Sequence, residues 1–259
     1  LSHIEQFQAL LPQVAGSDLA AYHPSQEAAF ATGVRLLWLF TCFLARVATP
    51  QATLAETLQQ AWAPHDSQVT HLLNAALILN ADHELSIPAF TARCIASTGT
   101  TLYGAIQGAL AAFHGVQSKK KLLHAFRFVR SIGESRQVQQ VLVEHLKQGE
   151  DIPGFEHHLF PAGDARPVML LSLLHAHYPQ APETRLVETL VAEVEKVLGI
   201  HPRIELAYAA LALILGLTDE QALTLFALAR CIGWIGHALE QAWSQQGIRP
   251  RARYTGRQP

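Results

Sequence analysis

Residues 186–199, Leu-Val-Glu-Thr-Leu-Val-Ala-Glu-Val-Glu-Lys-Val-Leu-Gly, predict an amphipathic α-helix and indicate the fold class of the chain. Leucine and valine recur at positions 186, 187, 190, 191, 194, 197 and 198, a spacing that aligns side chains along one side of a helix. Glutamate and lysine occupy the other side. Gly199 follows, and glycine at this position commonly ends a helix because it tolerates the left-handed conformation.

Three other segments show the same kind of pattern. Apolar residues at helical spacing fill 138–146 before Gly149, and 54–62 before Pro64. Thr-Asp-Glu-Gln at 218–221 fits a capping box, which predicts the start of a long apolar helix that extends to about Trp243. No stretch of five or more alternating residues lies between turn signals, so strands are expected to be minor. The predicted fold class is all-α.

Charged residues are scarce, at 15% against roughly 25% in an average soluble domain. Hydrophobic residues make up 49% and the net charge is only −2, which excludes a disordered chain. The charge balance also argues against a nucleic-acid partner or a charged membrane surface. The longest apolar runs, 36–45 and 206–217, are shorter than the ~20 residues of a spanning helix. We therefore expect no membrane span.

The chain is expected to work in the cytoplasm without a bound metal. Residues 1–30 lack the charged start and apolar stretch of a signal peptide. Cys42, Cys94 and Cys231 are widely spaced and form no Cys-x-x-Cys motif. This usage fits neither a disulfide framework nor a zinc site.

Four groups of polar residues stand in apolar surroundings: 80–85, 115–121, 154–166, and the set Glu205, Arg230 and Arg249. Each taken alone is also compatible with a solvated surface. Several histidines and arginines with one acid can converge on a polycarboxylate, because guanidinium groups pair with carboxylates in bidentate fashion. Glu205 is expected to be partly buried and to pair with either Arg203 or Arg230.

Taken together, these segments resemble the citrate synthase family. Asn-Ala-Asp-His-Glu-Leu at 80–85 resembles the family's His-Ala-Asp-His-Glu-Leu region. Ile-Pro-Gly-Phe-Glu-His at 152–157 resembles its Ile-Pro-Gly-Phe-Gly-His loop, and Gly-Asp-Ala-Arg at 163–166 its Gly-Asp-Pro-Arg. Residues 226–236 and 248–256 resemble its closing helix and tail. The resemblance runs from about residue 70 to the end, in order and with similar spacing.

The resemblance implies an all-α fold with a large domain, residues 1–118 and 213–259, and an inserted smaller domain, residues 119–212, that closes over the substrates. It also implies a homodimer and a Claisen-type condensation. In that reaction a carboxylate removes a proton alpha to an acyl-CoA thioester, the carbanion attacks a 2-oxoacid such as oxaloacetate, and hydrolysis releases CoA. Acyl-CoA would be a co-substrate, with no bound cofactor.

Carried over position by position, the resemblance also implies site residues. The substrate-binding residues would be His83, Arg166, Arg230 and Arg249. Of these, Arg249 would reach into the partner subunit's site. His157 would hydrogen-bond the reacting ketone, and Glu205 stands where the family has its catalytic Asp.

The departures from the family pattern concern the catalytic groups. Glu205 is one methylene longer than the family's Asp, and about 1 Å of misplacement can cost on the order of a hundredfold in rate. Ser118 falls on the histidine that stabilises the enol, and a lost donor of this kind costs about 10²–10³ in rate. Lys119 and Lys120 replace glycines of the same motif. A gapped alignment would place His114 there instead.

Further substitutions are Asn80 for a histidine, Glu156 for a glycine and His158 for an arginine. Two functions therefore stay open. One is a citrate synthase-like acyltransferase, or the reverse cleavage, with weakened activity. The alternative is an inactive family member that binds a dicarboxylate or 2-oxoacid as a regulatory or sensing module. A dimeric scaffold without a ligand site is a third interpretation.

Overall fold

The computed structural model of the protein describes residues 1–156, 159–253 and 255–256, without the side chains of residues 117 and 118. These residues form twelve α-helices, two short 3-10 helices and a single isolated bridge between Phe155 and Pro202. The α-helices are α1 (His3–Ser17), α2 (Gln26–Ala45), α3 (Leu54–Trp62), α4 (Gln68–Leu79), α5 (Ile87–Ala96), α6 (Leu102–His114), α7 (Val116–Ile132), α8 (Val138–Gln148), α9 (Ala165–His177), α10 (Pro182–Leu198), α11 (Ile204–Ile214) and α12 (Asp219–Ser244). The 3-10 helices are η1 (Leu19–Tyr22) and η2 (Ser135–Gln137). The all-α prediction is confirmed.

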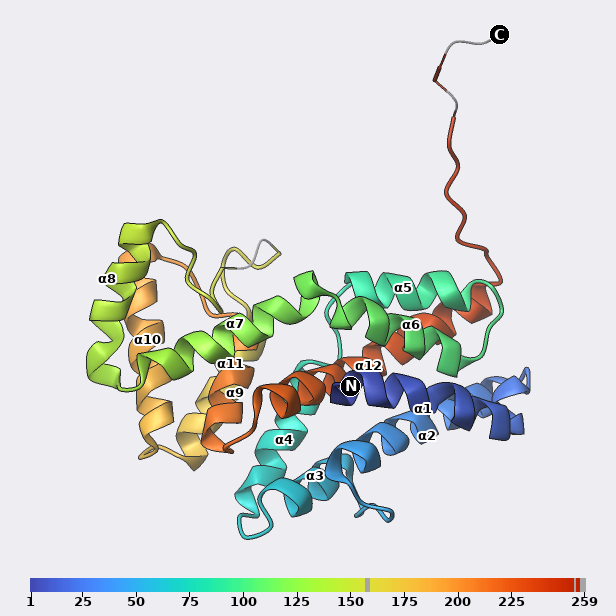
Figure 1. Cartoon of the computed structure of the whole chain (residues 1–259), viewed down its shortest axis with the longest axis horizontal. Helices are drawn as coiled ribbons and strands as arrows, with labels where there is room; N and C mark the ends of the chain where they lie inside the picture. Colours follow the sequence, from blue (N-terminus) through green and yellow to red (C-terminus); the bar gives the residue numbers. More distant parts are fainter. Residues whose placement is uncertain (157–158, 254, 257–259) are drawn as a thin grey trace.

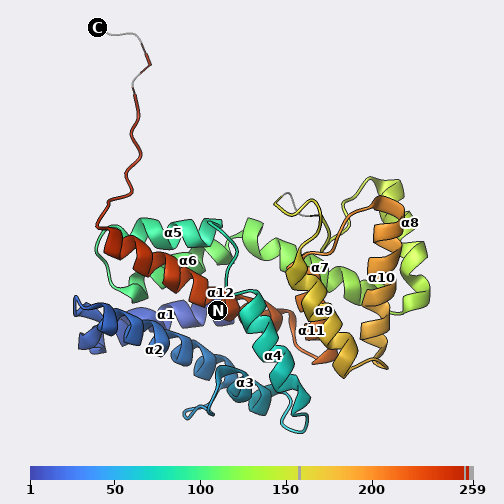
Figure 2. The ribbon, with the colours of Figure 1, turned by 180° about the vertical axis from the view of Figure 1, so that it is seen from behind.

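The helices lie in two groups joined by α7 (Figures 1 and 2). Helices α1 to α6 surround α12 in the larger group, and α8 to α11 form the smaller group at the other end of α7. Contacts of α4 with α9 and of α11 with α7 connect the two. The boundaries predicted at 118/119 and 212/213 fall inside α7 and α11, respectively.

Helix α12 is the central helix of the larger group and packs against α2, α4, α5 and α6. It begins with the predicted capping box: Gln221 N donates to Thr218 Oγ1 at 3.2 Å, and Thr218 N donates to Gln221 Oε1 at 3.0 Å. Because the cap satisfies amides that a helix start otherwise leaves unpaired, the sequence defines this end locally. The buried side of α12 carries Arg230 and Trp234.

The other sequence-predicted helices are also present. Helix α10 buries Leu186, Val187, Leu190 and Val194 and ends at Gly199, whose φ of 67° is left-handed. Helix α8 likewise ends at Gly149, and α3 ends before Pro64. In each of these helices the apolar stripe and the stop signal lie within one continuous segment, so periodicity is sufficient to predict them.

Two helices are long and apolar enough to cross a membrane by length and composition: α2 with 20 residues and α12 with 26. The prediction that no segment spans a membrane stays a prediction. It counted apolar runs only, whereas α2 continues through polar residues such as Thr32 and Arg35. In α12 the apolar window is 72% buried within the fold, as in a core helix of a folded domain.

Candidate functional site

A cavity of about 560 Å³ lies where the α4–α5 loop, α7, the start of α11 and α12 meet. Its polar wall includes His83, Lys121, Arg203 and Arg230. Its apolar wall includes Ile87, Pro88, Phe113, Leu159, Phe226 and Trp234. Two of the sequence-predicted binding residues, His83 in the α4–α5 loop and Arg230 on α12, therefore line the same cavity although they lie far apart in the chain.

Arg166 lies against His83, with Nη2 3.0 Å from His83 Nδ1. Its guanidinium also pairs with Asp164 at 2.6 Å and donates from Nη1 to the Asp82 carbonyl at 2.9 Å. Asp164 caps α9 by accepting from Arg166 N at 2.9 Å, so the start of α9 fixes the position of this arginine. Arg166 thus joins the smaller helix group to the His83 loop. Its role as a carboxylate ligand stays a prediction.

Arg230 is 3% exposed. Its Nη1 donates to the carbonyls of Asn80 and Ala81, at 3.2 and 2.7 Å, whereas its Nη2 has no hydrogen-bond partner among the described residues. Burial lowers the pKa of Arg230 to about 10, which leaves the side chain charged at neutral pH. The charge of Asp82 only partly offsets this effect of burial, and one buried N–H group of Arg230 stays unpaired, so this wall of the cavity favours an anion.

A glycine on α12 allows the His83 loop to approach this arginine. A Cβ atom on Gly233 would lie 2.2 Å from the Ala81 carbonyl oxygen. Such a contact is much shorter than van der Waals packing permits, so only glycine fits here without displacing the loop.

Glu205 is 8% exposed and lies in the first turn of α11. Arg203 holds both of its carboxylate oxygens, with Nη2 2.9 Å from Oε1 and Nε 3.2 Å from Oε2. Burial acts to raise the pKa of Glu205, but the charge and hydrogen bonds of Arg203, with a smaller effect of His83, bring it below its ordinary value of 4.5. Of the two pairings predicted for Glu205, the one with Arg203 is confirmed.

Backbone contacts hold Arg203 in place beside the 152–156 turn. Arg203 N donates to Gly154 O at 2.8 Å, and Glu156 N donates to His201 O at 3.0 Å. Arg203 Nη1 also donates to Glu156 O at 3.3 Å. The sequence predicts Arg203 only as a possible partner of Glu205 and does not predict its place at the cavity. Its place on the cavity wall depends on this turn packing against the start of α11.

Some predicted site residues cannot be placed at the cavity. His157 and His158 lie outside the described residues, and Ser118 belongs to the first turn of α7 without a described side chain. His114, which the gapped alignment places at the enol-stabilising position, lies with its Nε2 3.3 Å from Oγ of Ser2, the residue that caps α1. Arg249 is exposed in the extended segment after α12, which projects away from the helices (Figure 1). One copy of the chain therefore does not bring Arg249 to the cavity.

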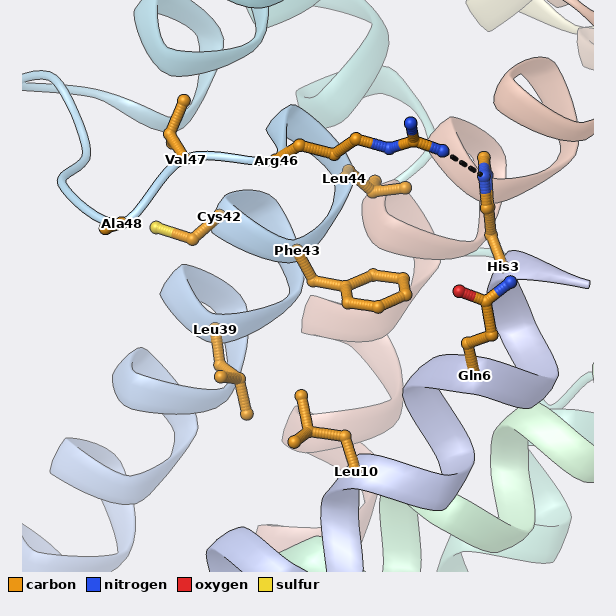
Figure 3. A pocket seen from close by; sticks show the side chains of 10 residues that line it. All are labelled: His3, Gln6, Leu10, Leu39, Cys42, Phe43, Leu44, Arg46, Val47 and Ala48. Carbon is orange, nitrogen blue, oxygen red and sulfur yellow. Dashed lines mark hydrogen bonds between the residues drawn. The ribbon is translucent and has the colours of Figure 1, made fainter.

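A second cavity, of about 470 Å³, lies between α1 and the end of α2 (Figure 3). Its wall is mostly apolar, with Arg46 and His3 at one side, 3.5 Å apart between Nη2 and Nε2. It contains none of the sequence-predicted site residues. Among the described residues, no group of three or more His, Cys, Asp or Glu side chains is arranged to hold a metal ion.

Comparison with known proteins identifies the family. The family model described as "Citrate synthase, C-terminal domain" matches residues 18–251. The chain belongs to the citrate synthase family. It is 31% identical over 189 residues to citrate synthase 2 of Bacillus subtilis, a match that covers 71% of this chain and 50% of that protein. The chain thus spans about half the length of the curated relatives it matches.

Solved structures of the family share the fold. Citrate synthase from Thermotoga maritima superposes with a TM-score of 0.80 at 25% identity and covers 100% of this chain and 73% of that one. The citrate synthase of the archaeon Thermoplasma acidophilum, solved as a ternary complex with carboxymethyl coenzyme A and oxaloacetate, gives a TM-score of 0.84 at 20% identity and covers 100% of this chain and 74% of that one.

Proposed function

We propose that the cavity binds a small dicarboxylate of the 2-oxoacid class, such as oxaloacetate, and that binding rather than rapid condensation is the function of this chain. The observation that carries the proposal is the buried guanidinium of Arg230, whose Nη2 lacks a partner among the described residues. A carboxylate would satisfy this donor and neutralise its charge.

The charges around the cavity support the same ligand class. Three cations, Lys121, Arg203 and Arg230, line it with one acid, Glu84. The buried acid Glu205 is paired with Arg203. His83 adds a hydrogen-bonding group to the lining. The net positive charge favours an anion with more than one carboxylate, because one group can pair with Arg230 and another can approach Arg203 or Lys121.

The state of Glu205 argues against efficient condensation. A general base must accept a proton, and it does so best when its pKa lies near the working pH. Arg203 occupies both carboxylate oxygens of Glu205 and holds its pKa below the ordinary value. Proton abstraction from an acyl-CoA would first require this ion pair to open.

Weak acyl transfer is the second candidate. It is favoured by a carboxylate buried at the family's base position and by membership of the citrate synthase family. In this case acyl-CoA is the co-substrate, and the reaction is the condensation described above or its reverse.

Calorimetry and a thiol-release assay separate these functions. Oxaloacetate should bind the parent chain, and Arg230→Gln should lose most of that affinity. Arg136→Gln, which alters an exposed surface pair, serves as the matched control and should bind normally. Absence of binding by the parent would overturn the proposal. Steady release of CoA thiol from acetyl- or propionyl-CoA, abolished by Glu205→Gln, would favour the acyltransferase instead.

We also propose a homodimer in which Arg249 of one copy reaches the cavity of the other, and a division into domains near 118/119 and 212/213. Two observations support the dimer: the tail is exposed, and α2 exposes the apolar residues Phe30 and Val34, which a second copy of the chain would cover. Light scattering on the full chain should give a dimeric mass. Arg249→Ala should then weaken oxaloacetate binding without changing that mass.

A further inference from the structure

Two residues of α12 that line the cavity carry buried donors without partners among the described residues. Arg230 and Trp234 are four residues apart, so they lie on one side of the helix, and both line the cavity. Arg230 Nη2 and Trp234 Nε1 each lack a hydrogen-bond partner among the described residues. Trp234 is 0% exposed.

Two buried donors without hydrogen-bond partners among the described residues, four residues apart on one helix, are unusual. Nearly all buried polar groups in folded proteins are hydrogen-bonded, and each exception carries a desolvation cost. The indole ring itself is well packed, with its centroid 5.7 Å from that of Phe113. Packing therefore accounts for the ring, and the unsatisfied N–H group requires another explanation.

We infer that Trp234 is a ligand-binding residue whose indole N–H and Arg230 Nη2 together hold one carboxylate of the bound dicarboxylate. This inference rests on the proposed function and adds a second donor to it. Two separate donors fix the orientation of a carboxylate, whereas Arg230 Nη2 alone would hold it at one group, because Nη1 is already engaged by the Asn80 and Ala81 carbonyls. Trp234 would thus select for a ligand that presents a carboxylate between the two groups.

The test compares two tryptophans of the same helix. Trp234→Phe retains an aromatic ring and removes only the N–H donor. Trp243→Phe is the matched control. Trp243 also packs against a phenylalanine, Phe30, with 5.2 Å between the ring centroids, but it lies outside the cavity. Calorimetry with oxaloacetate should show an affinity about tenfold weaker for Trp234→Phe, since a hydrogen bond to a charged acceptor is lost. Trp243→Phe should match the parent.

A spectroscopic readout separates binding from a loss of packing. The chain has four tryptophans, so ¹H–¹⁵N spectra should contain four indole signals. Oxaloacetate should shift one of them downfield, and that signal should be missing from the Trp234→Phe spectrum. If the parent binds oxaloacetate without a shift of its Trp234 indole signal, or if Trp234→Phe binds as tightly as the parent, the inference is overturned and the proposed function stands. If the parent binds none, both fail.

Discussion

Arg203 forms a two-pronged ion pair with Glu205 across the first turn of α11, with N–O distances of 2.9 and 3.2 Å. The resemblance places Glu205 at the position of the family's catalytic Asp. The pair therefore engages the carboxylate that would act as a base, and its cation, Arg203, lies on the wall of the cavity.

Replacing Arg203 by Asn should raise the pKa of Glu205. Burial acts to raise this pKa and Arg203 is the main opposing influence, so its removal should leave the value above 4.5. Titration of the Glu205 carboxyl by ¹³C NMR, assigned with Glu205→Gln, measures the shift. Arg136→Asn is the surface control and should leave the Glu205 titration unchanged. A pKa that stays low in Arg203→Asn would show that another group stabilises the carboxylate.

Glu205→Gln should destabilise the fold in a pH-dependent manner. The folded pKa lies below the unfolded value, so the charged pair contributes stability above about pH 4.5, and that contribution is lost as the pH falls through the folded pKa. At pH 7 the variant should be less stable by about 1.5–3 kcal/mol, because Arg203, whose side chain is 15% exposed, loses hydrogen bonds to a charged acceptor. Urea unfolding between pH 3 and 7 checks this. A difference that grows toward low pH would contradict the assigned sign.

Gly233→Ala should lower both stability and oxaloacetate affinity, because the added Cβ would meet the Ala81 carbonyl that Arg230 binds. Gly236→Ala lies almost one turn further along α12, and a Cβ there meets nothing within 4 Å. This control should be neutral or more stable by up to about 1 kcal/mol, as expected for alanine replacing glycine in a helix. Thermal unfolding and calorimetry measure both effects. Equal stability and equal oxaloacetate affinity of Gly233→Ala and Gly236→Ala would contradict the close approach of Gly233 to the Ala81 carbonyl.

Tyr178→Phe should loosen the contact between the two helix groups. The Tyr178 hydroxyl, just after α9, donates to the Asp66 carboxylate before α4, and His177 Nδ1 lies 3.0 Å from Gln68 Oε1 beside it. Loss of a hydrogen bond to a charged group should cost about 1.5–3 kcal/mol. Tyr22→Phe, at an exposed tyrosine, should cost almost nothing. Hydrogen exchange at α4 and α9 should increase in Tyr178→Phe alone, and unchanged protection there would argue against this connection.

Much of the fold could be predicted because its signals are local. The stripe of α10, the capping box of α12 and the stop at Gly199 each lie within one continuous segment. The full length of α2 was missed because this helix continues past the apolar run through Thr32 and Arg35. The approach of Gly233 to Ala81 joins residues that no periodicity connects, so it could not be predicted.

By itself the sequence determined the all-α class, the ends of four helices, the family and most of the polar segments that meet at the cavity. Only the tertiary structure decided how these groups are paired. It assigned Arg203 to Glu205, placed Arg166 against His83, left Arg230 Nη2 and Trp234 Nε1 without partners among the described residues, and kept Arg249 away from its own cavity. Helix formation depends on neighbours within a few residues. The state of a buried charge depends instead on atoms such as the Asn80 carbonyl, 150 residues from Arg230, which only the folded chain brings within hydrogen-bonding distance.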